Sequence, residues 1–360
     1  MKILLINFLD KRYGSTYRAR QIFRCLKEIN ADVKYIESNS SIEGAVSIPQ
    51  ADNGFGYLVA MAIRSFYCLF LSYDVIYIQK FILPAVPCIA IAKFRRKKVY
   101  VDWDDLDSDF QRTQFRKNIT KGIEAAYPKK ASLITVHNEY LKKHAQNAGA
   151  KDVRLLNQIV DTVSFDPDKY DSAETKIQLN LKNKVVAGFL CTLTHGGAAD
   201  LDIIAEAMNE AVRKYPQLFF LIIGGGPLET SFKESFEGRG LRNYRITGLL
   251  KQEDVPKYVS ACDFCMVYMR DNPGNKMRMS FKTLEYLAMN KTVVGNFTGE
   301  TLDKLGPYCI HTGLRAEDFV KVIGKVIDTG NFLAPHQARK YILENHSIET
   351  MKTQLKEIFG

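Results

Sequence analysis

The stretch that decides the fold is Phe264–Gly295, FCMVYMRDNPGNKMRMSFKTLEYLAMNKTVVG. It begins with an apolar run typical of a buried strand, passes through a polar loop, and then takes on the apolar spacing of an amphipathic helix. A second strand, Thr292–Gly295, follows at once. This order of strand, helix and strand predicts a parallel pair whose connecting helix covers one face of the sheet.

The same alternation extends from this unit toward both ends of the chain, as parallel sheets with helices on both faces require. In the second half, with this unit included, it predicts strands at Lys184–Cys191, Leu218–Ile223, Tyr244–Thr247 and Phe264–Met269, with helices at Leu201–Lys214, Glu253–Ala261 and Phe281–Asn290. In the first half it predicts strands at Lys2–Leu9, Val33–Glu37, Val75–Gln79, Lys98–Asp102, Leu133–Val136 and Val153–Leu156, with helices such as Tyr17–Ile29 and Asn138–Ala148.

A chain of 360 residues is too long for one ordinary α/β core, so we expect two domains. The polar stretch Asp161–Asn183 interrupts the alternation and is the predicted linker. The fold prediction is α/β, with two doubly wound, Rossmann-like domains facing across a cleft: residues 1–165, joined by a C-terminal helix at about 345–360, and residues 166–344. The two final helices, Gln337–Glu344 and Ile348–Phe359, are expected to cross back to the first domain.

Three local features bear on the location of the protein. The start, MKILLINFLDKRYG, reads as a buried first strand, and seven cysteines without a pairing pattern favour reduced thiols, so we expect a cytoplasmic protein. The apolar segment Gly56–Tyr73 is interrupted by Arg64, which favours a core or interface helix over a membrane span. Cys262 and Cys265 have redox or zinc spacing but no second pair, which favours buried thiols.

The formal net charge of +10 indicates an anionic partner. Basic residues are not interleaved with aromatic ones as a base-stacking platform, so no nucleic acid is expected. The cluster Phe94–Lys98 is either a solvated loop or a contact for a membrane surface or an acceptor phosphate. Peripheral contact with an anionic membrane, at the inner face of the plasma membrane, therefore stays open.

A candidate ligand site lies at the start of the helix Phe281–Asn290. Ser280 is the expected N-cap, and Lys282 and Glu285 share one edge of the helix, one turn apart. The alternative is that Lys282 and Glu285 form a surface ion pair. Against it, a lysine in the first turn opposes the helix dipole, and a helical ion pair is weaker when the lysine precedes the glutamate. A helix N-terminus with an added cation can bind a diphosphate, and a carboxylate one turn further along the helix can accept hydrogen bonds from both ribose hydroxyls.

Loops in the same domain supply further candidate donor-binding residues. Lys276 and Arg278 could add cations for the same phosphates, and the glycine-rich loop Gly188–Gly197 could form an anion-binding nest. The loop Ile223–Pro227 does not match the dinucleotide motif, which argues against such a cofactor. The predicted donor-binding residues in these loops are Thr194, His195, Gly196, Gly224, Gly225, Gly248 and Leu249, with a turn-filling role as the alternative for His195.

Two candidate features lie in the first half. A carboxylate cluster follows a strand at Asp104 and Asp105, with Asp107 and Asp109 beyond. Three interpretations are open: the carboxylates bind acceptor hydroxyls and include a base, they cap a helix and solvate a turn, or they hold a metal. Gly14 begins a turn between the first strand and the first helix, where it either approaches donor phosphate or acceptor, or forms part of an ordinary N-cap.

These blocks together resemble family 4 glycosyltransferases with the GT-B fold over nearly the whole chain. The blocks that carry the resemblance are Val186–Gly188, Leu221–Pro227, Ile246–Gly248, Asp254–Tyr258, Ser280–Ala288 and Thr292–Gly295, with Tyr73–Ile78, Tyr100–Asp105 and Asn138–Leu141 in the acceptor domain. By the resemblance, Glu285 corresponds to the second glutamate of the family's E-x7-E element and would bind the ribose, while Lys282 would face the diphosphate. Met277 stands where the first glutamate would be.

The resemblance implies a retaining hexosyltransferase that needs neither a metal nor another cofactor. The catalytic candidates are Lys282, Asp104 and Asp105. The expected partners are a nucleotide-sugar and a glycan or polyprenyl- or lipid-linked acceptor, in cell-surface polysaccharide or lipopolysaccharide biosynthesis. A sugar-nucleotide epimerase on the same fold and a catalytically silent nucleotide-binding subunit are the alternatives.

Overall fold

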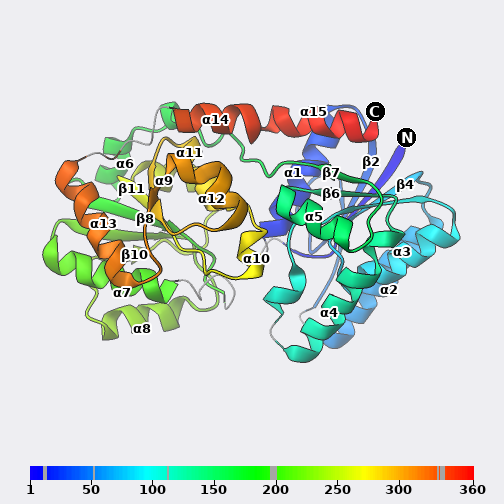
Figure 1. Ribbon diagram of the computed structural model, residues 1–360, viewed down its shortest axis with the longest axis horizontal. Coiled ribbons are helices and arrows are strands. Elements are labelled where there is room, and N and C mark those ends of the chain that lie inside the picture. Colours follow the sequence, from blue (N-terminus) through cyan, green and yellow to red (C-terminus); the bar gives the residue numbers. More distant parts are fainter. Residues whose placement is uncertain (11–13, 52, 112, 195–200, 331, 333–336) are drawn as a thin grey trace. The chain divides into compact units, whose positions relative to one another are not determined.

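The computed structural model describes residues 1–10, 14–51, 53–111, 113–194, 201–330, 332 and 337–360. They form two compact units. The first comprises Met1–Ile159, Met277–Met279 and Ile348–Gly360, and the second comprises Val160–Lys276 and Ser280–Ser347. Each unit contains one parallel sheet with helices on both of its faces (Figure 1).

The sheet of the first unit has the strand order β3-β2-β1-β4-β5-β6-β7. Its strands are β1 (Lys2–Asn7), β2 (Asp32–Ser38), β3 (Ala45–Ile48), β4 (Val75–Gln79), β5 (Lys98–Asp102), β6 (Leu133–Val136) and β7 (Val153–Leu155). Its longer helices are α1 (Gly14–Glu28), α2 (Gly54–Phe70), α3 (Ala85–Phe94), α4 (Gln114–Ala126), α5 (Glu139–Asn147) and α15 (Ile348–Phe359). The strand order reverses between β1 and β4, where sheets of this type bind ligands.

Apolar clusters on the two faces of this sheet hold the first unit together. On one face α1 and α15 pack together, and Ile22, Leu26, Met351 and Leu355 are buried in one cluster. The other cluster contains side chains of α3 and β5 and the only tryptophan, Trp103, which is fully buried. The first unit therefore takes part of its core from residues near the end of the sequence.

One buried ion pair joins α1 to the sheet. The Arg18 guanidinium donates to both carboxylate oxygens of Asp102 at 2.7 and 2.9 Å, and to the carbonyl of Leu156 at 2.8 Å. Both charged side chains are almost completely buried. Asp102 is thus occupied by a structural contact at the end of β5.

The sheet of the second unit has the strand order β10-β9-β8-β11-β12-β13. Its strands are β8 (Val185–Leu190), β9 (Leu218–Ile223), β10 (Tyr244–Ile246), β11 (Phe264–Val267), β12 (Thr292–Gly295) and β13 (Ile310–His311). Its helices are α6 (Ser172–Gln178), α7 (Leu201–Lys214), α8 (Glu229–Gly238), α9 (Val255–Ser260), α10 (Pro273–Lys276), α11 (Phe281–Ala288), α12 (Gly299–Leu305), α13 (Ala316–Thr329) and α14 (Gln337–Asn345). Here the order reverses between β8 and β11.

The prediction of a linker at residues 161–183 is wrong, because this stretch belongs to the second unit and contains α6. Asp171 caps the helix by accepting from the amides of Ala173 and Glu174. The Lys176 ammonium lies 2.6 Å from the Asp263 carboxylate. The polar composition therefore reflects capping and an ion pair. The two units divide after Ile159 and after Ser347, whereas the predicted boundaries were residue 165 and about residue 345.

The apolar segment Gly56–Tyr73 forms most of α2. None of the helices in the described parts of the chain has the length and apolar character that crossing a bilayer requires. Cys262 and Cys265 are buried thiols, as predicted, and the other five cysteines are thiols as well.

Candidate functional site

The candidate donor site is built on the first turn of α11, which follows β11. Ser280 caps this helix, since its hydroxyl accepts from the amide of Thr283 at 3.3 Å. Tyr286, on the buried side of α11, accepts a hydrogen bond from the amide of Leu190 at the end of β8. These two contacts hold the start of α11 beside the point where the strand order reverses, which is where nucleotides bind in such sheets.

Lys282 lies against an aromatic ring in this first turn. Its ammonium is 4.4 Å from the centroid of Phe189, a fully buried residue of β8. No carboxylate of the described residues lies within 4.0 Å of this ammonium. Lys282 therefore does not form the surface ion pair that was the alternative, and its positive charge remains available to an anion.

Glu285 is buried beside Lys282, with 4% of its surface exposed. Its carboxylate accepts a hydrogen bond from the side-chain amide of Gln252 at 3.4 Å. Burial raises the pKa of Glu285 to about 8, against the opposing effects of the Gln252 hydrogen bond and the charge of Lys282. A buried carboxyl group with one long hydrogen bond has unused acceptor capacity, which two vicinal hydroxyls would satisfy.

The glycine loop after β9 packs on the two neighbouring loops without room for side chains. A β-carbon on Gly224, whose φ is +132°, would lie 2.1 Å from the carbonyl oxygen of Cys191. One on Gly225 would lie 2.6 Å from the backbone of both Gly248 and Leu249. The Thr247 hydroxyl accepts from the Gly224 amide at 2.9 Å, so the loops after β9 and β10 form one surface.

The other predicted donor-binding residues are less closely grouped. The Lys276 ammonium lies 3.0 Å from Asp271, so its charge is partly neutralised, and Leu249 is 77% exposed. Arg278 belongs to the first unit, where it lies 3.2 Å from Asp105. Gly14 is the exposed first residue of α1, also in the first unit, and Thr194 lies in the loop after β8. His195 and Gly196 fall outside the described residues.

In the first unit, the carboxylate cluster surrounds a lysine that the sequence analysis missed. Lys80 follows β4 in a left-handed conformation with φ of 71°, and only 3% of its side chain is exposed. Its ammonium lies 2.8 Å from Asp104, 2.9 Å from Asp107 and 3.6 Å from Asp105. The sequence gives no signal for Lys80, because only the pairing of β4 with β5 brings it to these carboxylates.

This lysine changes what each carboxylate can do. Burial lowers the pKa of Lys80, but the Asp104, Asp107 and Asp105 charges outweigh it and raise that pKa well above its ordinary value. Burial would raise the pKa of Asp104, yet Lys80 brings it below its ordinary value. Burial raises the pKa of Asp107 to about 7.

A lysine ammonium thus occupies the centre of the cluster, which opposes the metal-site hypothesis. Within the described residues, no group of three or more His, Cys, Asp or Glu side chains is suited to hold a metal ion. Asp104 is a weak proton acceptor because its ionised form is stabilised, whereas Asp107 can exchange a proton near neutral pH. Asp105 is 19% exposed against 5% for Asp104, so Asp105 is the more accessible of the two predicted residues.

Residues 184–329 match the protein family described as "Glycosyl transferases group 1". That segment, 146 of the 360 residues, is a group 1 glycosyltransferase domain. The matched segment contains the start of α11, both glycine loops and Gln252, so it includes every predicted donor-binding residue except Gly14. The sequence-based prediction of the family is confirmed.

The solved structures establish the fold of this glycosyltransferase as GT-B. Sucrose-phosphate synthase from Thermosynechococcus elongatus is 15% identical, with a TM-score of 0.78 over 99% of this chain and 98% of its own. Anabaena HepE in complex with UDP-glucose is 16% identical, with a TM-score of 0.78 over 99% of both chains. WaaG, a glycosyltransferase involved in lipopolysaccharide biosynthesis, is 11% identical, with a TM-score of 0.73 over 99% of both chains. No curated protein matches the sequence.

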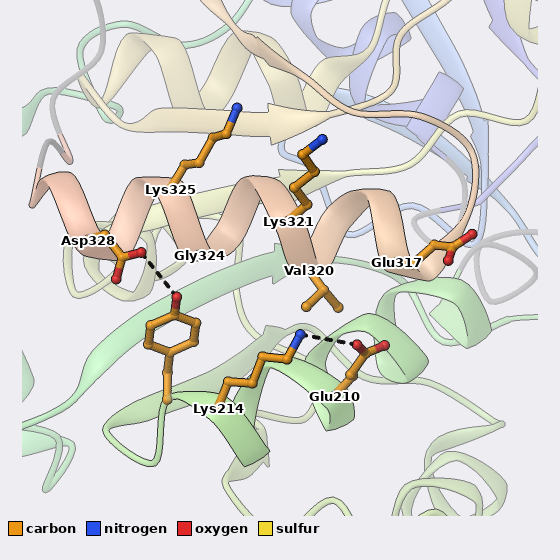
Figure 2. A pocket seen from close by; sticks show the side chains of 9 residues that line it. Glu210, Lys214, Glu317, Val320, Lys321, Gly324, Lys325 and Asp328 are labelled. Atoms are coloured by element: carbon orange, nitrogen blue, oxygen red, sulfur yellow. Dashed lines mark hydrogen bonds and ion pairs between the residues drawn. The ribbon is translucent and has the colours of Figure 1, made fainter.

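A shallow hollow of about 370 Å³ lies elsewhere on the glycosyltransferase, between α7 and α13 (Figure 2). Its charged side chains are partly paired: Lys214 with Glu210 at 3.5 Å, and the Tyr215 hydroxyl with Asp328 at 3.2 Å. It contains no residue of α11 or of the glycine loops. We assign no ligand to this hollow.

The packing of the glycine loop gives a first testable prediction for this glycosyltransferase. Gly225→Ala would place a methyl group against two backbone atoms that cannot move independently, so the Gly248–Leu249 turn must shift. We expect nucleotide affinity to fall by about tenfold or more, equivalent to about 1.4 kcal/mol. Calorimetric titration with UDP and GDP measures it.

Gly238→Ala in α8 is the matched control, because its β-carbon would meet nothing within 4 Å and alanine favours a helix. This variant should bind nucleotide like the wild type. Equal affinities for the wild type and Gly225→Ala would show that the two loops do not contact the nucleotide.

Proposed function

We propose that this glycosyltransferase moves a sugar from a nucleotide-sugar donor to a glycan or lipid-linked glycan acceptor. The observation that carries the proposal is the pairing of an unneutralised ammonium, Lys282, with a buried carboxyl group, Glu285, at the start of α11. In this assignment Glu285 accepts the ribose hydroxyls and Lys282 stabilises the diphosphate as it leaves. HepE was solved with UDP-glucose, which favours a UDP-sugar as the donor.

We propose retention of anomeric configuration and no requirement for a metal. Charge on the leaving diphosphate would be stabilised by Lys282 and by backbone amides at the start of α11. Of the further predicted cations, Lys276 lies near Asp271 and Arg278 near Asp105, which leaves Lys282 as the principal one.

For the acceptor we propose the carboxylate cluster around Lys80. Of the three carboxylates around Lys80, Asp105 is the most exposed, at 19% against 14% for Asp107 and 5% for Asp104, and it could accept a hydrogen bond from an acceptor hydroxyl. Asp107, with a pKa of about 7, is the group best placed to take up a proton at neutral pH. The WaaG likeness and the net charge of +10 support an acceptor in cell-surface polysaccharide or lipopolysaccharide biosynthesis at the inner face of the plasma membrane.

The test is a panel of UDP- and GDP-sugars offered with lipid-linked and free glycan acceptors, with nucleotide release as the readout. We expect release that depends on one donor and on an acceptor, with and without EDTA. NMR of the sugar product separates the epimerase alternative, since an epimerase needs no acceptor. Nucleotide binding without turnover across the panel would identify a silent binding subunit and would overturn the proposal.

A further inference from the structure

One helix of the first unit carries its apolar residues on the outside. In α2, six large apolar side chains are more than a third exposed, including Phe55 at 79% and Phe70 at 65%. They lie three, four or seven residues apart, which places them on one side of the helix, and so they form one stripe along it. We call this stripe the α2 face: Phe55, Leu58, Val59, Phe66, Leu69 and Phe70.

The only charged residue of α2 points the other way. Arg64 is fully buried, its guanidinium donates to the side chains of Ser38 and Gln50, and it lies 5.3 Å from the ring centroid of Phe8. A helix that faced water would carry its charge outside and its apolar groups inside. Because the arrangement is reversed, the α2 face carries no charge that would favour contact with water. An exposed apolar surface of this kind marks a site that binds a partner or a membrane.

Basic residues adjoin the α2 face at the end of α3, which packs against α2. The Arg95 guanidinium donates to the carbonyls of Cys68 and Leu71 at 2.7 and 2.8 Å, which joins the ends of the two helices. Beside it, Phe94 is 84% exposed, and Lys93 and Arg96 are exposed as well.

Acidic residues are almost absent from this part of the sequence. Between Gly54 and Val101, the only one is Asp74. The α2 face and the adjoining end of α3 are therefore apolar and positively charged.

We propose that the α2 face, together with Phe94, Lys93 and Arg96, docks the protein on an anionic lipid bilayer. Interfacial helices bind membranes by placing Phe and Leu among the acyl chains while Lys and Arg contact anionic headgroups. A second copy of the chain is a poorer occupant, because a symmetric dimer through this face would bring two basic clusters together. The inference deepens the membrane location given in the proposed function and rests on it, but the contact uses no residue of the donor site, so sugar transfer can be tested separately.

The test is sedimentation of the full chain with vesicles of phosphatidylcholine alone or with about 30% phosphatidylglycerol, at low and high salt. We expect binding to the anionic vesicles at low salt and weaker binding at high salt, because salt screens the charged part of the attraction. Phe66→Asp/Phe70→Asp and Lys93→Gln/Arg96→Gln should each reduce the partition coefficient by about tenfold or more. Ile177→Asp, an exposed apolar residue of α6 in the second unit, is the matched control and should bind like the wild type.

Insertion of the helix can be measured directly with Phe70→Trp. Because Trp103 is the only tryptophan and is fully buried, brominated lipids should quench the new tryptophan and leave the emission of the wild type unchanged. Thermal shifts with UDP and GDP show in parallel whether each variant is folded. A folded protein that binds nucleotide but not anionic vesicles, or whose α2 variants bind vesicles normally, would overturn this inference and leave the proposed sugar transfer intact. Concentration-dependent self-association that the α2 variants abolish, without vesicle binding, would instead identify a second copy as the occupant.

Discussion

Lys282→Met is expected to reduce kcat by about two to three orders of magnitude, the effect typical of removing one group that stabilises charge in a transition state. Methionine keeps an unbranched apolar chain that can still lie on the ring of Phe189, so the substitution removes the charge and little of the packing. Negative charge grows on the diphosphate as the sugar–phosphate bond breaks, so the loss should be greater in kcat than in nucleotide affinity. Steady-state nucleotide release with the donor selected by the panel measures the effect.

Lys233→Met is the matched control for this substitution. Lys233 lies in α8 of the same unit, half-exposed and paired with Glu229 at 2.8 Å, outside the candidate site. This variant should turn over like the wild type. If Lys282→Met kept wild-type kcat while remaining folded, stabilisation of the leaving diphosphate would have to be assigned to another group.

Glu285→Gln is expected to stabilise the ligand-free protein, and the gain should grow with pH. The pKa of Glu285 is about 8 in the folded protein, against an ordinary value of 4.5. Between these values the unfolded chain has released the proton while the folded protein retains it, so the wild type loses stability as pH rises. The loss through this group is on the order of 4 kcal/mol by pH 8, and glutamine removes it.

Thermal melting of both proteins from pH 5 to pH 9 measures this prediction. The difference in melting temperature should widen up to about pH 8, to on the order of ten degrees, and then level off. Glu253→Gln, at a carboxylate that is 75% exposed, should show a constant difference. A constant difference for Glu285→Gln would mean that its carboxyl group is not buried in solution.

Nucleotide binding should depend on pH in the opposite sense. Ribose hydroxyls that donate to Glu285 favour the ionised carboxylate, so the affinity of the wild type for UDP should rise toward pH 8. In Glu285→Gln the affinity should be lower and independent of pH in this range. Wild-type affinity in the variant would show that the ribose is bound elsewhere.

Most of the fold could be predicted from the sequence because buried parallel strands are continuous apolar runs. The predicted strands Val75–Gln79, Lys98–Asp102 and Thr292–Gly295 coincide with β4, β5 and β12. β3 and β13 were missed because they are short edge strands, and β13 is exposed and has only two residues. α6 was missed because its stretch is stabilised by capping and ion pairs rather than by a long apolar stripe.

The candidate site could be predicted only where it follows local rules. Ser280 and Glu285 lie on one helix, so a cap signal and helical spacing were sufficient to find them. Gln252 and Lys80 reach their partners through tertiary structure, from segments 33 and 24 residues away, and no spacing rule connects them. The ion pair between Lys80 and Asp104 could not be predicted for the same reason.

The final helix has a consequence for how the protein is synthesised. α15 covers α1 in the core of the first unit, yet it is translated after the whole of the second unit. Translation proceeds at about 5–20 residues per second, so on the order of ten seconds or more pass between the synthesis of Ile22 and Leu26 and that of Met351 and Leu355, which cover them. A premature stop codon just before residue 348 would thus leave the second unit complete and expose the apolar face of α1 in the first unit to water.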